Sequence, residues 1–363
     1  MYIGIPKESR PFEYRVGLSP AGVEILSQFG HQVFVEHDAG ASAGFKDPDY
    51  EKAGARIAFS PQEVFGRADL LLKISRPLKQ ELEWLNEGAI LAGFLHLASA
   101  SQDQIDLLLE KKITALAYEQ ITDPQGGRVV LRQFSLICGA MVAQIAARWL
   151  QTNRGGKGIM LSGVPGVPPA EVVILGGGAV GTSAARALLQ AGAHVTVLDK
   201  SMTALESIHD KLPGVVTMMA TRRNIERATA FADVVVGAVL VSGQRAPVIV
   251  TRDMVRAMKP RSVIIDVSID QGGCVETSRP TMHDNPAFIE EGIVHYCVPN
   301  IASTVARTAS HVLLNSAFPY IAEIANHGID AAMKADPSIE AAVNTHQGKL
   351  RNLVRLGGAE VME

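Results

Sequence analysis

The chain has 363 residues, of which 47% are hydrophobic and 20% are charged, and its formal net charge at pH 7 is −3. This length is enough for two domains, and the small negative charge excludes the basic footprint that nucleic-acid binding requires. No apolar run is long enough to span a bilayer and no signal peptide is visible at the start, so we expect no membrane association. The three cysteines have no zinc-ligand spacing with histidines, which disfavours disulfides and a metal site and favours a cytoplasmic protein.

The first third of the chain alternates between predicted strands and helices. Strands are predicted at residues 2–6, 31–36, 68–74, 89–97 and 113–119. Helices are predicted after Ser19-Pro20, where proline takes the first helical position, and over residues 101–112. This alternation is typical of an α/β domain. A long apolar-faced helix, predicted at 136–151 with Ser135 as its cap, then leads out of this domain.

The stretch EVVILGGGAVGTSAARALLQAGAHVTVLDK begins at Glu171 and predicts a strand, a glycine-rich turn, a helix and a second strand. Gly176, Gly178 and Gly181 have the G-x-G-x-x-G spacing, which allows a tight turn, close approach of a pyrophosphate and helix packing. The pyrophosphate would bind the exposed N–H groups at the helix start. Asp199 ends the second strand and would accept from a ribose hydroxyl while repelling a 2′-phosphate. We therefore predict NAD rather than NADP, a preference that the neighbouring Lys200 could weaken.

After Asp199 the alternation continues. Strands are predicted at residues 232–240, 261–270 and 295–300, followed by a helix over about 303–325 and a polar tail. We predict an α/β fold with two Rossmann-like parallel-sheet domains. An NAD-binding domain, residues 130–302, is expected to be inserted into a substrate domain that consists of residues 1–129 and 303–363. A small ligand is expected in a cleft between two such domains.

Four charged or titratable residues lie where a strand or loop would meet that cleft: Arg15, Lys73, His96 and Asp270. Arg15 could bind a carboxylate through two hydrogen bonds, although a lone arginine is more often a surface residue. Lys73 could pair with a substrate oxygen or simply extend to solvent. His96 suits acid–base chemistry near neutral pH, although a histidine among apolar residues is often structural. Asp270 follows a nucleotide-domain strand at the end where nicotinamide would lie.

Five segments give these residues a common context: IPKESRPFEYRVGLSP, ADLLLKI, FLHLA, GVPGVPPAEVVILGGGAVG and MKPRSVIIDVSIDQGGC. Their order along the whole chain resembles the alanine dehydrogenase and pyridine nucleotide transhydrogenase family, and most closely its alanine dehydrogenases. Asp270 stands where the transhydrogenases usually have Glu, which favours the deaminating branch. The resemblance implies an inserted NAD domain, a hexamer, and NAD-dependent oxidative deamination of L-alanine to pyruvate and ammonium.

The resemblance also implies roles for individual residues. Arg15 and Lys73 would hold the substrate carboxylate, and Glu119 would orient one of them. His96 would move protons, and Asp270 would direct the water or the amine. Further substrate contacts are expected from Arg132, Phe134 and Asn300. The expected cofactor contacts are Ser135, Gly176, Gly178, Ala179, Val180, Gly181, Asp199, Val239, Leu240, Ile269, Asp270, Asn300 and Ile301.

One segment departs from the family pattern. In VVLRQFSLICGAMVA (129–143), Arg132-Gln133 replaces a small residue and proline, Phe134 replaces a pocket methionine, and Leu136 replaces a glutamate. Arg76 stands where a glutamate is usual, and Ile301 where a methionine is typical. These changes leave three functions open: an alanine dehydrogenase with neutral replacements, a dehydrogenase of a larger or acidic amino acid, or a non-catalytic NAD-binding paralogue.

Overall fold

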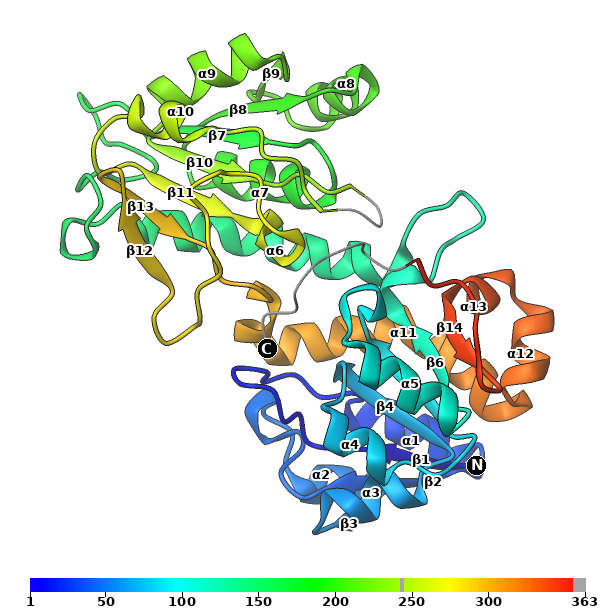
Figure 1. Ribbon diagram of the computed structural model, residues 1–363. Helices are drawn as coiled ribbons and strands as arrows, with labels where there is room; N and C mark the ends of the chain where they lie inside the picture. Colours follow the sequence, from blue (N-terminus) through cyan, green and yellow to red (C-terminus); the bar gives the residue numbers. More distant parts are fainter. Residues whose placement is uncertain (242–244, 355–363) are drawn as a thin grey trace. The chain divides into compact units, whose positions relative to one another are not determined.

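The computed structural model describes residues 1–241 and 245–354, and the chain forms two compact units (Figure 1). The first unit consists of Met1–Phe134 and the described part of Ser303–Glu363, and the second consists of Ser135–Ala302. The second unit is thus inserted in sequence between the two segments of the first. The first of the two crossings lies inside helix α6 (Val129–Trp149).

The first unit is built on an eight-stranded sheet in the order β15-β14-β6-β5-β4-β1-β2-β3. The strands are β1 (Tyr2–Ile5), β2 (Gln32–Glu36), β3 (Arg56–Ala58), β4 (Leu70–Ser75), β5 (Ile90–Phe94), β6 (Thr114–Ala117), β14 (Val343–His346) and β15 (Lys349–Leu350). Strands β1 to β6 are parallel, whereas β14 and β15 pair antiparallel at one edge. The helices are α1 (Pro20–Gln28), α2 (Asp47–Lys52), α3 (Pro61–Arg67), α4 (Lys79–Trp84), α5 (Gln102–Glu110), α11 (Ala306–His327), α12 (Ile329–Ala335) and α13 (Pro337–Ala342).

The second unit contains a seven-stranded sheet in the order β12-β13-β11-β10-β7-β8-β9. Its strands are β7 (Glu171–Leu175), β8 (His194–Asp199), β9 (Val216–Met219), β10 (Val234–Gly237), β11 (Val263–Asp266), β12 (Ala287–Glu290) and β13 (Ile293–Tyr296). All pairs are parallel except β12 with β13. Besides α6, its helices are α7 (Ala179–Gln190), α8 (Met202–Lys211), α9 (Arg222–Phe231) and α10 (Arg252–Arg256).

The two sheets share one strand order. In each, the first strand of the unit is central, the second and third lie on one side, and the fourth and fifth lie on the other. This is the doubly wound arrangement, in which ligands bind at the carboxyl ends of the strands where the order reverses. The reversal falls between β1 and β4 in the first unit and between β7 and β10 in the second.

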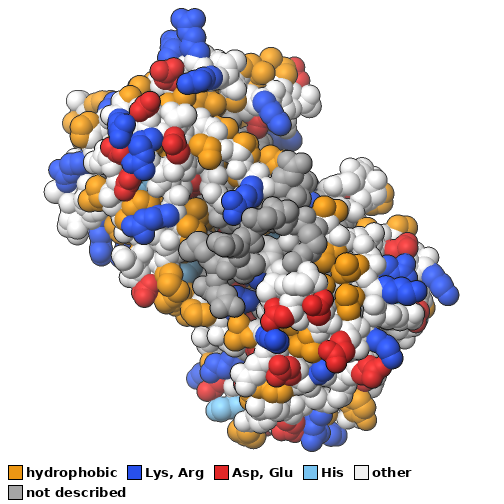
Figure 2. All heavy atoms as spheres, viewed as in Figure 1, with side chains coloured by type: hydrophobic (Ala, Val, Ile, Leu, Met, Phe, Trp, Pro, Cys, Tyr) orange, Lys and Arg blue, Asp and Glu red, His pale blue; other side chains and the backbone are white. Residues whose placement is uncertain are grey.

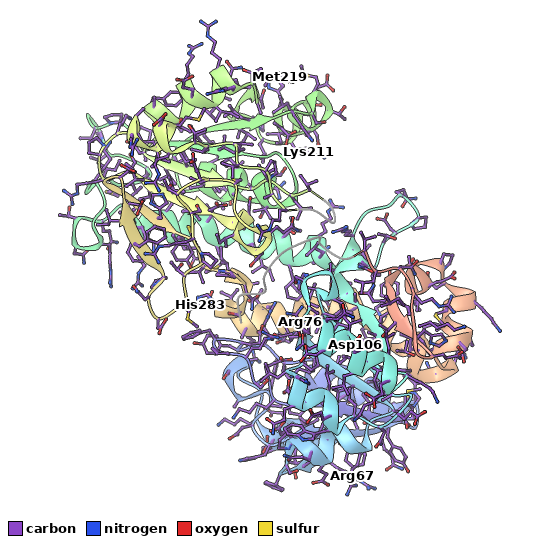
Figure 3. All side chains as sticks on the ribbon, in the orientation of Figure 1. Arg67, Arg76, Asp106, Lys211, Met219 and His283 are labelled. Carbon is purple, nitrogen blue, oxygen red and sulfur yellow. The ribbon has the colours of Figure 1, made fainter. Side chains whose placement is uncertain are left out.

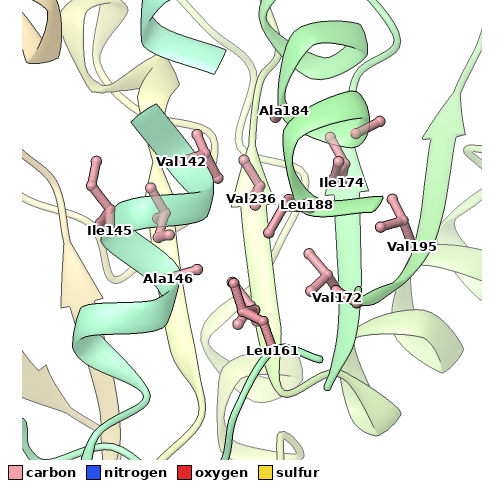
Figure 4. Packing of buried hydrophobic residues seen from close by; sticks show 14 of the residues in the cluster. Val142, Ile145, Ala146, Leu161, Val172, Ile174, Ala184, Leu188, Val195 and Val236 are labelled. Carbon is pink, nitrogen blue, oxygen red and sulfur yellow. The ribbon is translucent and has the colours of Figure 1, made fainter. Parts of the chain in front are cut away.

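Helix α6 contributes to the core of the second unit. Val142, Ile145 and Ala146 pack in the same buried cluster as Val172 of β7 and Leu188 of α7 (Figure 4). Burial of an aliphatic side chain of this size contributes about 1.5–3 kcal/mol. Within the described residues, α6 is also the one helix that is long and apolar enough, by length and composition alone, to cross a membrane. Its packing against the sheet explains that composition.

Two local predictions are wrong. Helix α6 begins at Val129 rather than at residue 136, so Ser135 lies inside the helix and does not cap it. No glycine or proline follows Gly127 before the apolar run, and the buried Val130 and Phe134 are one helical turn apart, which continues the helix upstream. The strand predicted at 295–300 is also not the last, because β14 and β15 follow it and extend the first sheet beside β6.

The surface in Figure 2 shows acidic and basic side chains interspersed on the visible face, which matches a net charge of −3. Away from the strand ends, His37, Asp38 and Asp47 form one group with the geometry to bind a metal ion. The His37 ring pairs with both carboxylates, at 2.5 Å to Asp47 and 3.4 Å to Asp38, and its side chain is largely exposed. These contacts account for the cluster as a surface ion-pair group.

Candidate functional site

The polar residues of the first unit gather after the carboxyl ends of four neighbouring strands. Arg15 lies in the segment after β1, Arg76 directly follows β4, His96 follows β5, and Glu119 follows β6. Strands β1, β4, β5 and β6 are adjacent in the sheet, and the strand order reverses between β1 and β4. This edge is therefore the position at which a doubly wound sheet binds small ligands.

Arg15 is buried and held by two contacts. Its Nε and Nη2 donate to the two carboxylate oxygens of Glu13, at 2.7 and 2.5 Å. The guanidinium lies 5.4 Å from the centre of the Phe134 ring. Glu13 occupies two of the five N–H groups of Arg15, so other donors remain for a ligand carboxylate. The structure thus places predicted residues Arg15 and Phe134 together.

Lys73 is buried on β4. Its side chain is 1% exposed, and its ammonium pairs with Glu81 at 3.2 Å and with Glu8 at 3.5 Å. Burial raises the pKa of the Glu8 carboxyl, which also accepts from the Ile74 amide. The contact of Lys73 with a substrate carboxylate stays a prediction, and in this structure its ammonium is held by two carboxyl groups.

The hydroxyl of Ser75 also reaches the Glu13 carboxylate that holds Arg15. Ser75 Oγ donates to Glu13 Oε2 at 3.1 Å, the same oxygen that accepts from Arg15. The pairing of β4 with β5 shifts register between Leu72 and Ser75, so the regular alternation of side chains is interrupted between Lys73 and Ser75. Their position along the strand separates them, because only Ser75 is at its carboxyl end.

His96 is bound through its backbone and stacked on one side. Its N–H donates to Glu119 Oε1 at 2.6 Å, and its carbonyl accepts from Arg76 Nη1 at 3.0 Å. The imidazole stacks on Phe94 with ring centres 6.3 Å apart, and Nδ1 lies 3.7 Å from Glu119 Oε1. The prediction that Glu119 orients Lys73 or Arg15 does not match these contacts, since Glu119 binds residues 95 and 96.

Aromatic contacts connect the Arg15 and His96 ends of this group. Phe94 meets Phe134 edge to face, with ring centres 4.8 Å apart, and it also stacks with His96. Arg15, Phe134, Phe94 and His96 therefore form one chain of contacts at the carboxyl edge. These four side chains provide a cation for a carboxylate, an apolar wall and a titratable ring. Together they suit a small amino or oxo acid.

The glycine loop of the second unit has the geometry of a pyrophosphate site. Gly176 has φ +108° and lies so close to the Ala238 carbonyl that an added Cβ would be 2.4 Å from its oxygen. An added Cβ at Gly181 would be 1.8 Å from the Gly176 oxygen, whereas one at Gly178 would meet open space. The open position is at the N-cap of the twelve-residue helix α7, where free N–H groups attract an anion. Ala179 and Val180 form the first turn of that helix.

Asp199 ends β8 beside this loop. Its carboxylate accepts from the Gly177 amide at 2.6 Å and from the Ser201 amide at 2.7 Å. The acid is thus held against the glycine turn, as ribose recognition in this fold requires. The bare backbone at Gly178 and the acid at Asp199 together fit a dinucleotide.

The remaining predicted cofactor residues follow other carboxyl ends of the same sheet. Asp270 lies in a 3-10 turn after β11, and its Oδ1 accepts from the amide of Asn300, which follows β13 and has φ +58°. The others on this edge are Val239 and Leu240 after β10, Ile269 after β11 and Ile301 after β13. Ser135 and Arg132 lie in α6, where Arg132 is exposed.

Sequence inspection missed several residues that shape these sites. In the first unit they are Glu13, Ser75 and Phe94. In the second unit Asp266 is buried and accepts from the amides of Ser268, Cys274 and Val275, which folds the loop that contains Asp270. Burial raises the pKa of this carboxyl. The prediction places Asp266 inside a strand at 261–270, whereas the strand ends at Asp266, and an acid within an apolar run four residues before Asp270 was the available signal.

Two doubly wound units, one with a glycine loop that fits a dinucleotide, match the architecture of pyridine-nucleotide oxidoreductases. Residues 4–137 match the family model "Alanine dehydrogenase/PNT, N-terminal domain", and residues 142–353 match "Alanine dehydrogenase/PNT, C-terminal domain". The chain belongs to the alanine dehydrogenase/PNT family. The predicted family, fold class and enzyme class are thereby confirmed.

Individual relatives agree with this assignment. An alanine dehydrogenase from Halomonas elongata is 44% identical over 366 residues, covering all of this chain and 98% of that protein. A solved L-alanine dehydrogenase superposes with a TM-score of 0.92 at 41% identity over 96% of both chains. A transhydrogenase structure from Sinorhizobium meliloti gives a TM-score of 0.82 at 26% identity, covering 96% of this chain and 98% of that one.

Proposed function

We propose that the chain catalyses the reversible reaction L-alanine + NAD⁺ + H₂O ⇌ pyruvate + NH₄⁺ + NADH + H⁺. The observation that supports it best is the chain of contacts from Arg15 through Phe134 and Phe94 to His96 at the carboxyl edge of the first sheet. The greater similarity to alanine dehydrogenases than to the transhydrogenase supports the deaminating branch. We assign the first unit to the substrate and the second to the cofactor.

In this proposal the first unit binds and orients the amino acid. Arg15 binds the carboxylate through the N–H groups that Glu13 leaves open, which fixes the direction of Cα. Phe134 and Phe94 line the side-chain end with apolar surface. After hydride loss, His96 takes a proton from the water that attacks the iminium carbon, and it returns a proton to the departing amine.

The second unit binds NAD in this proposal. The N-terminus of α7 at Gly178 would hold the pyrophosphate, and Asp199 would accept from the ribose hydroxyls, which favours NAD over NADP. When bound, NAD would supply the acceptor for the hydride that leaves Cα. Asp270 directs the attacking water or the amine, and the backbone of Asn300 holds its carboxylate in place. Cofactor contacts from Val239, Leu240, Ile269 and Ile301 complete this assignment.

We further propose a cytoplasmic homo-oligomer, a hexamer as in the resemblance stated above, that acts on small molecules. Cys138, Cys274 and Cys297 form no disulfide in the described part of the chain, which suits a reducing compartment. Burial raises the pKa of the Cys297 thiol to about 12 and that of Cys274 well above its usual value, so both are unreactive structural thiols.

One observation favours a second candidate, the dehydrogenase of another amino acid. Phe134 is buried against both Arg15 and Phe94, so it changes the shape of the substrate end relative to the methionine of the family pattern. Arg132, two residues earlier, adds an exposed cation. This candidate predicts that pyruvate is a poor substrate and that another 2-oxo acid is reduced.

The test follows NADH absorbance with ammonium and a panel of 2-oxo acids: glyoxylate, pyruvate, oxaloacetate, 2-oxoglutarate and bulkier acids. We expect the highest kcat/KM with pyruvate. A preference for another acid would replace alanine by the second candidate, and Phe134→Met should then shift the preference toward pyruvate. NADH binding without turnover of any acid would refute catalysis and leave the non-catalytic paralogue.

A further inference from the structure

The backbone of His96 is held by two ionic groups that come from the two strands beside its own. Strand β5 lies between β4 and β6 in the sheet. Arg76, directly after β4, donates from Nη1 to the His96 carbonyl at 3.0 Å, and Glu119, after β6, accepts the His96 N–H at 2.6 Å. Residue 96 is therefore clamped on both sides of its Cα.

The clamp holds a strained conformation. His96 has φ +43° and ψ +43°, in the left-handed region that is unfavourable for an L-residue with a side chain. Hydrogen bonds to charged groups are stronger than those between neutral groups, so the two bonds to residue 96 favour this conformation. The Oγ of Ser99 donates to the same carbonyl at 3.0 Å, but Ser99 is a neutral donor.

Packing does not fix the imidazole. The His96 side chain is 61% exposed, and Phe94 covers one face of the ring. In the left-handed conformation the Cα–Cβ bond points in a different direction from that of an extended residue, so the backbone decides where the ring lies. Whatever fixes the backbone at residue 96 therefore fixes the ring.

Arg76 is itself anchored. Its carbonyl accepts from Arg10 Nε at 2.9 Å, which ties the residue to the segment after β1. The next residue is Pro77, which restricts Arg76 to extended backbone and removes an amide donor. The arginine thus reaches across from β4 to β5 from a rigid base, as a positioning group requires.

We propose that Arg76 is a positioning residue for His96, acting together with Glu119 to hold residue 96 in the left-handed conformation that aims the imidazole at the substrate. A cation at position 76, where the family pattern usually has glutamate, is then part of how this chain positions its proton-transfer group. The proposal rests on the proposed function for the role of His96, but the clamp itself is testable without turnover.

The kinetic test compares Arg76→Met, which removes the donor, with Arg76→Lys, which keeps one, in the reductive amination of the best 2-oxo acid. Misplacing a catalytic group by about 1 Å can cost up to about 100-fold in rate, and we expect Arg76→Met to lower kcat about 10- to 100-fold. KM for NADH should be unchanged, and Arg76→Lys should recover most of the loss.

Arg67→Met is the matched control, because Arg67 precedes β4 at the opposite end from Arg76 and pairs with Glu63 (Figure 3). We expect it to behave as wild type. A kcat for Arg76→Met equal to that of the control would overturn the proposal. So would a loss confined to KM for the oxo acid, because Arg76 would then be a substrate contact.

A second measurement is independent of activity. Diethylpyrocarbonate modifies exposed imidazoles, and peptide mass spectrometry gives the rate at each histidine. Loss of the clamp should release the His96 ring from Phe94 and raise its modification rate several-fold in Arg76→Met, while the exposed His209 on α8 reacts as before. An unchanged His96 rate overturns the clamp even in an active enzyme. A wild-type enzyme inactive on every oxo acid, with a raised His96 rate in the variant, refutes the proposed function and leaves the clamp standing.

Discussion

The two units of this chain share a strand order but prepare their ligand edges in opposite ways. In the second unit the ligand edge exposes backbone and no side chains at the glycine loop. A Cβ at Gly178 would meet open space, and the lack of a Cβ at Gly176 and Gly181 allows a tight turn. In the first unit the edge is covered with long side chains in fixed contacts, such as Arg15 on Glu13 and Phe134. One fold thus offers either its N–H groups or its side chains to a ligand.

The difference follows from what each ligand needs. A pyrophosphate is a diffuse anion that several backbone N–H groups can bind, so the protein must mainly keep Cβ atoms away. A small amino acid must be held in one orientation for hydride transfer, which requires directional contacts at both ends. Directional side chains must themselves be held, and in the first unit Glu13 and Glu119 hold Arg15 and His96.

The largest expected effect comes from adding a Cβ to the glycine loop of the second unit. Gly181→Ala places a Cβ 1.8 Å from the Gly176 oxygen, so the turn must open. We expect loss of about 1–3 kcal/mol of stability and an NADH affinity at least about 10-fold weaker, measured by thermal unfolding and by NADH fluorescence titration.

Gly178→Ala is the comparison for that experiment. Its φ of −71° suits alanine and its Cβ meets no protein atom, so the free energy of unfolding should stay near wild type while NADH binding weakens. If Gly178→Ala binds NADH as wild type does, the ligand does not approach the backbone there. If both variants lose stability equally, the two glycines do not have separate roles.

The next effect concerns the acid beside that loop. Asp199→Asn keeps an oxygen acceptor for the Gly177 amide but removes the charge. Hydrogen bonds to charged groups are worth about 1.5–3 kcal/mol, so NADH affinity should fall about 10- to 100-fold. NADPH affinity should fall less or rise, because the repulsion of a 2′-phosphate is gone. Equal losses for both cofactors in the same titration would show that Asp199 does not distinguish them.

This contrast also explains which parts of the chain could be predicted from sequence. The glycine loop follows from local rules, since spacing, strand and helix are contiguous from Glu171 to Asp199. The fold class follows from the alternation of strands and helices. Arg15, Phe134 and His96 were recognised and do come together in one chain of contacts.

The rest of the first site depends on contacts between distant segments. Strand β4 is buried along nearly its whole length, so its pattern does not reveal that Ser75 reaches the Glu13 carboxylate that holds Arg15. The partners that hold Lys73 are Glu8, which precedes it by 65 residues, and Glu81 on the next helix. The clamp on His96 likewise joins residues from three strands, and no single segment reveals it.

The smallest expected effect concerns how the stability of each unit depends on pH. In the second unit His295 is fully buried, with Nδ1 hydrogen-bonded to the Ile293 carbonyl and Nε2 hydrogen-bonded to the Thr277 hydroxyl. Burial lowers its pKa below 6.5. Below that pH the unfolded chain binds a proton that the folded chain resists, so this stability is present above about pH 6.5 and is lost as the pH falls.

In the first unit the shift has the opposite sign. Burial raises the pKa of Glu8 above 4.5, so the stability that this group favours is present in acid and is lost as the pH rises. Asp266 of the second unit shares the sign of Glu8, because burial raises its pKa as well. Acidification from pH 7.5 to 5.5 therefore separates the two units only through the loss of the His295 contribution in the second. Hydrogen exchange resolved by peptide should show faster exchange in β11 and β13 at pH 5.5, once rates are corrected for intrinsic chemistry.

His295→Gln keeps a hydrogen-bonding side chain but does not titrate, so it should flatten this dependence. If the variant keeps the wild-type slope, another group in the second unit is responsible, and the contrast between the units does not rest on His295.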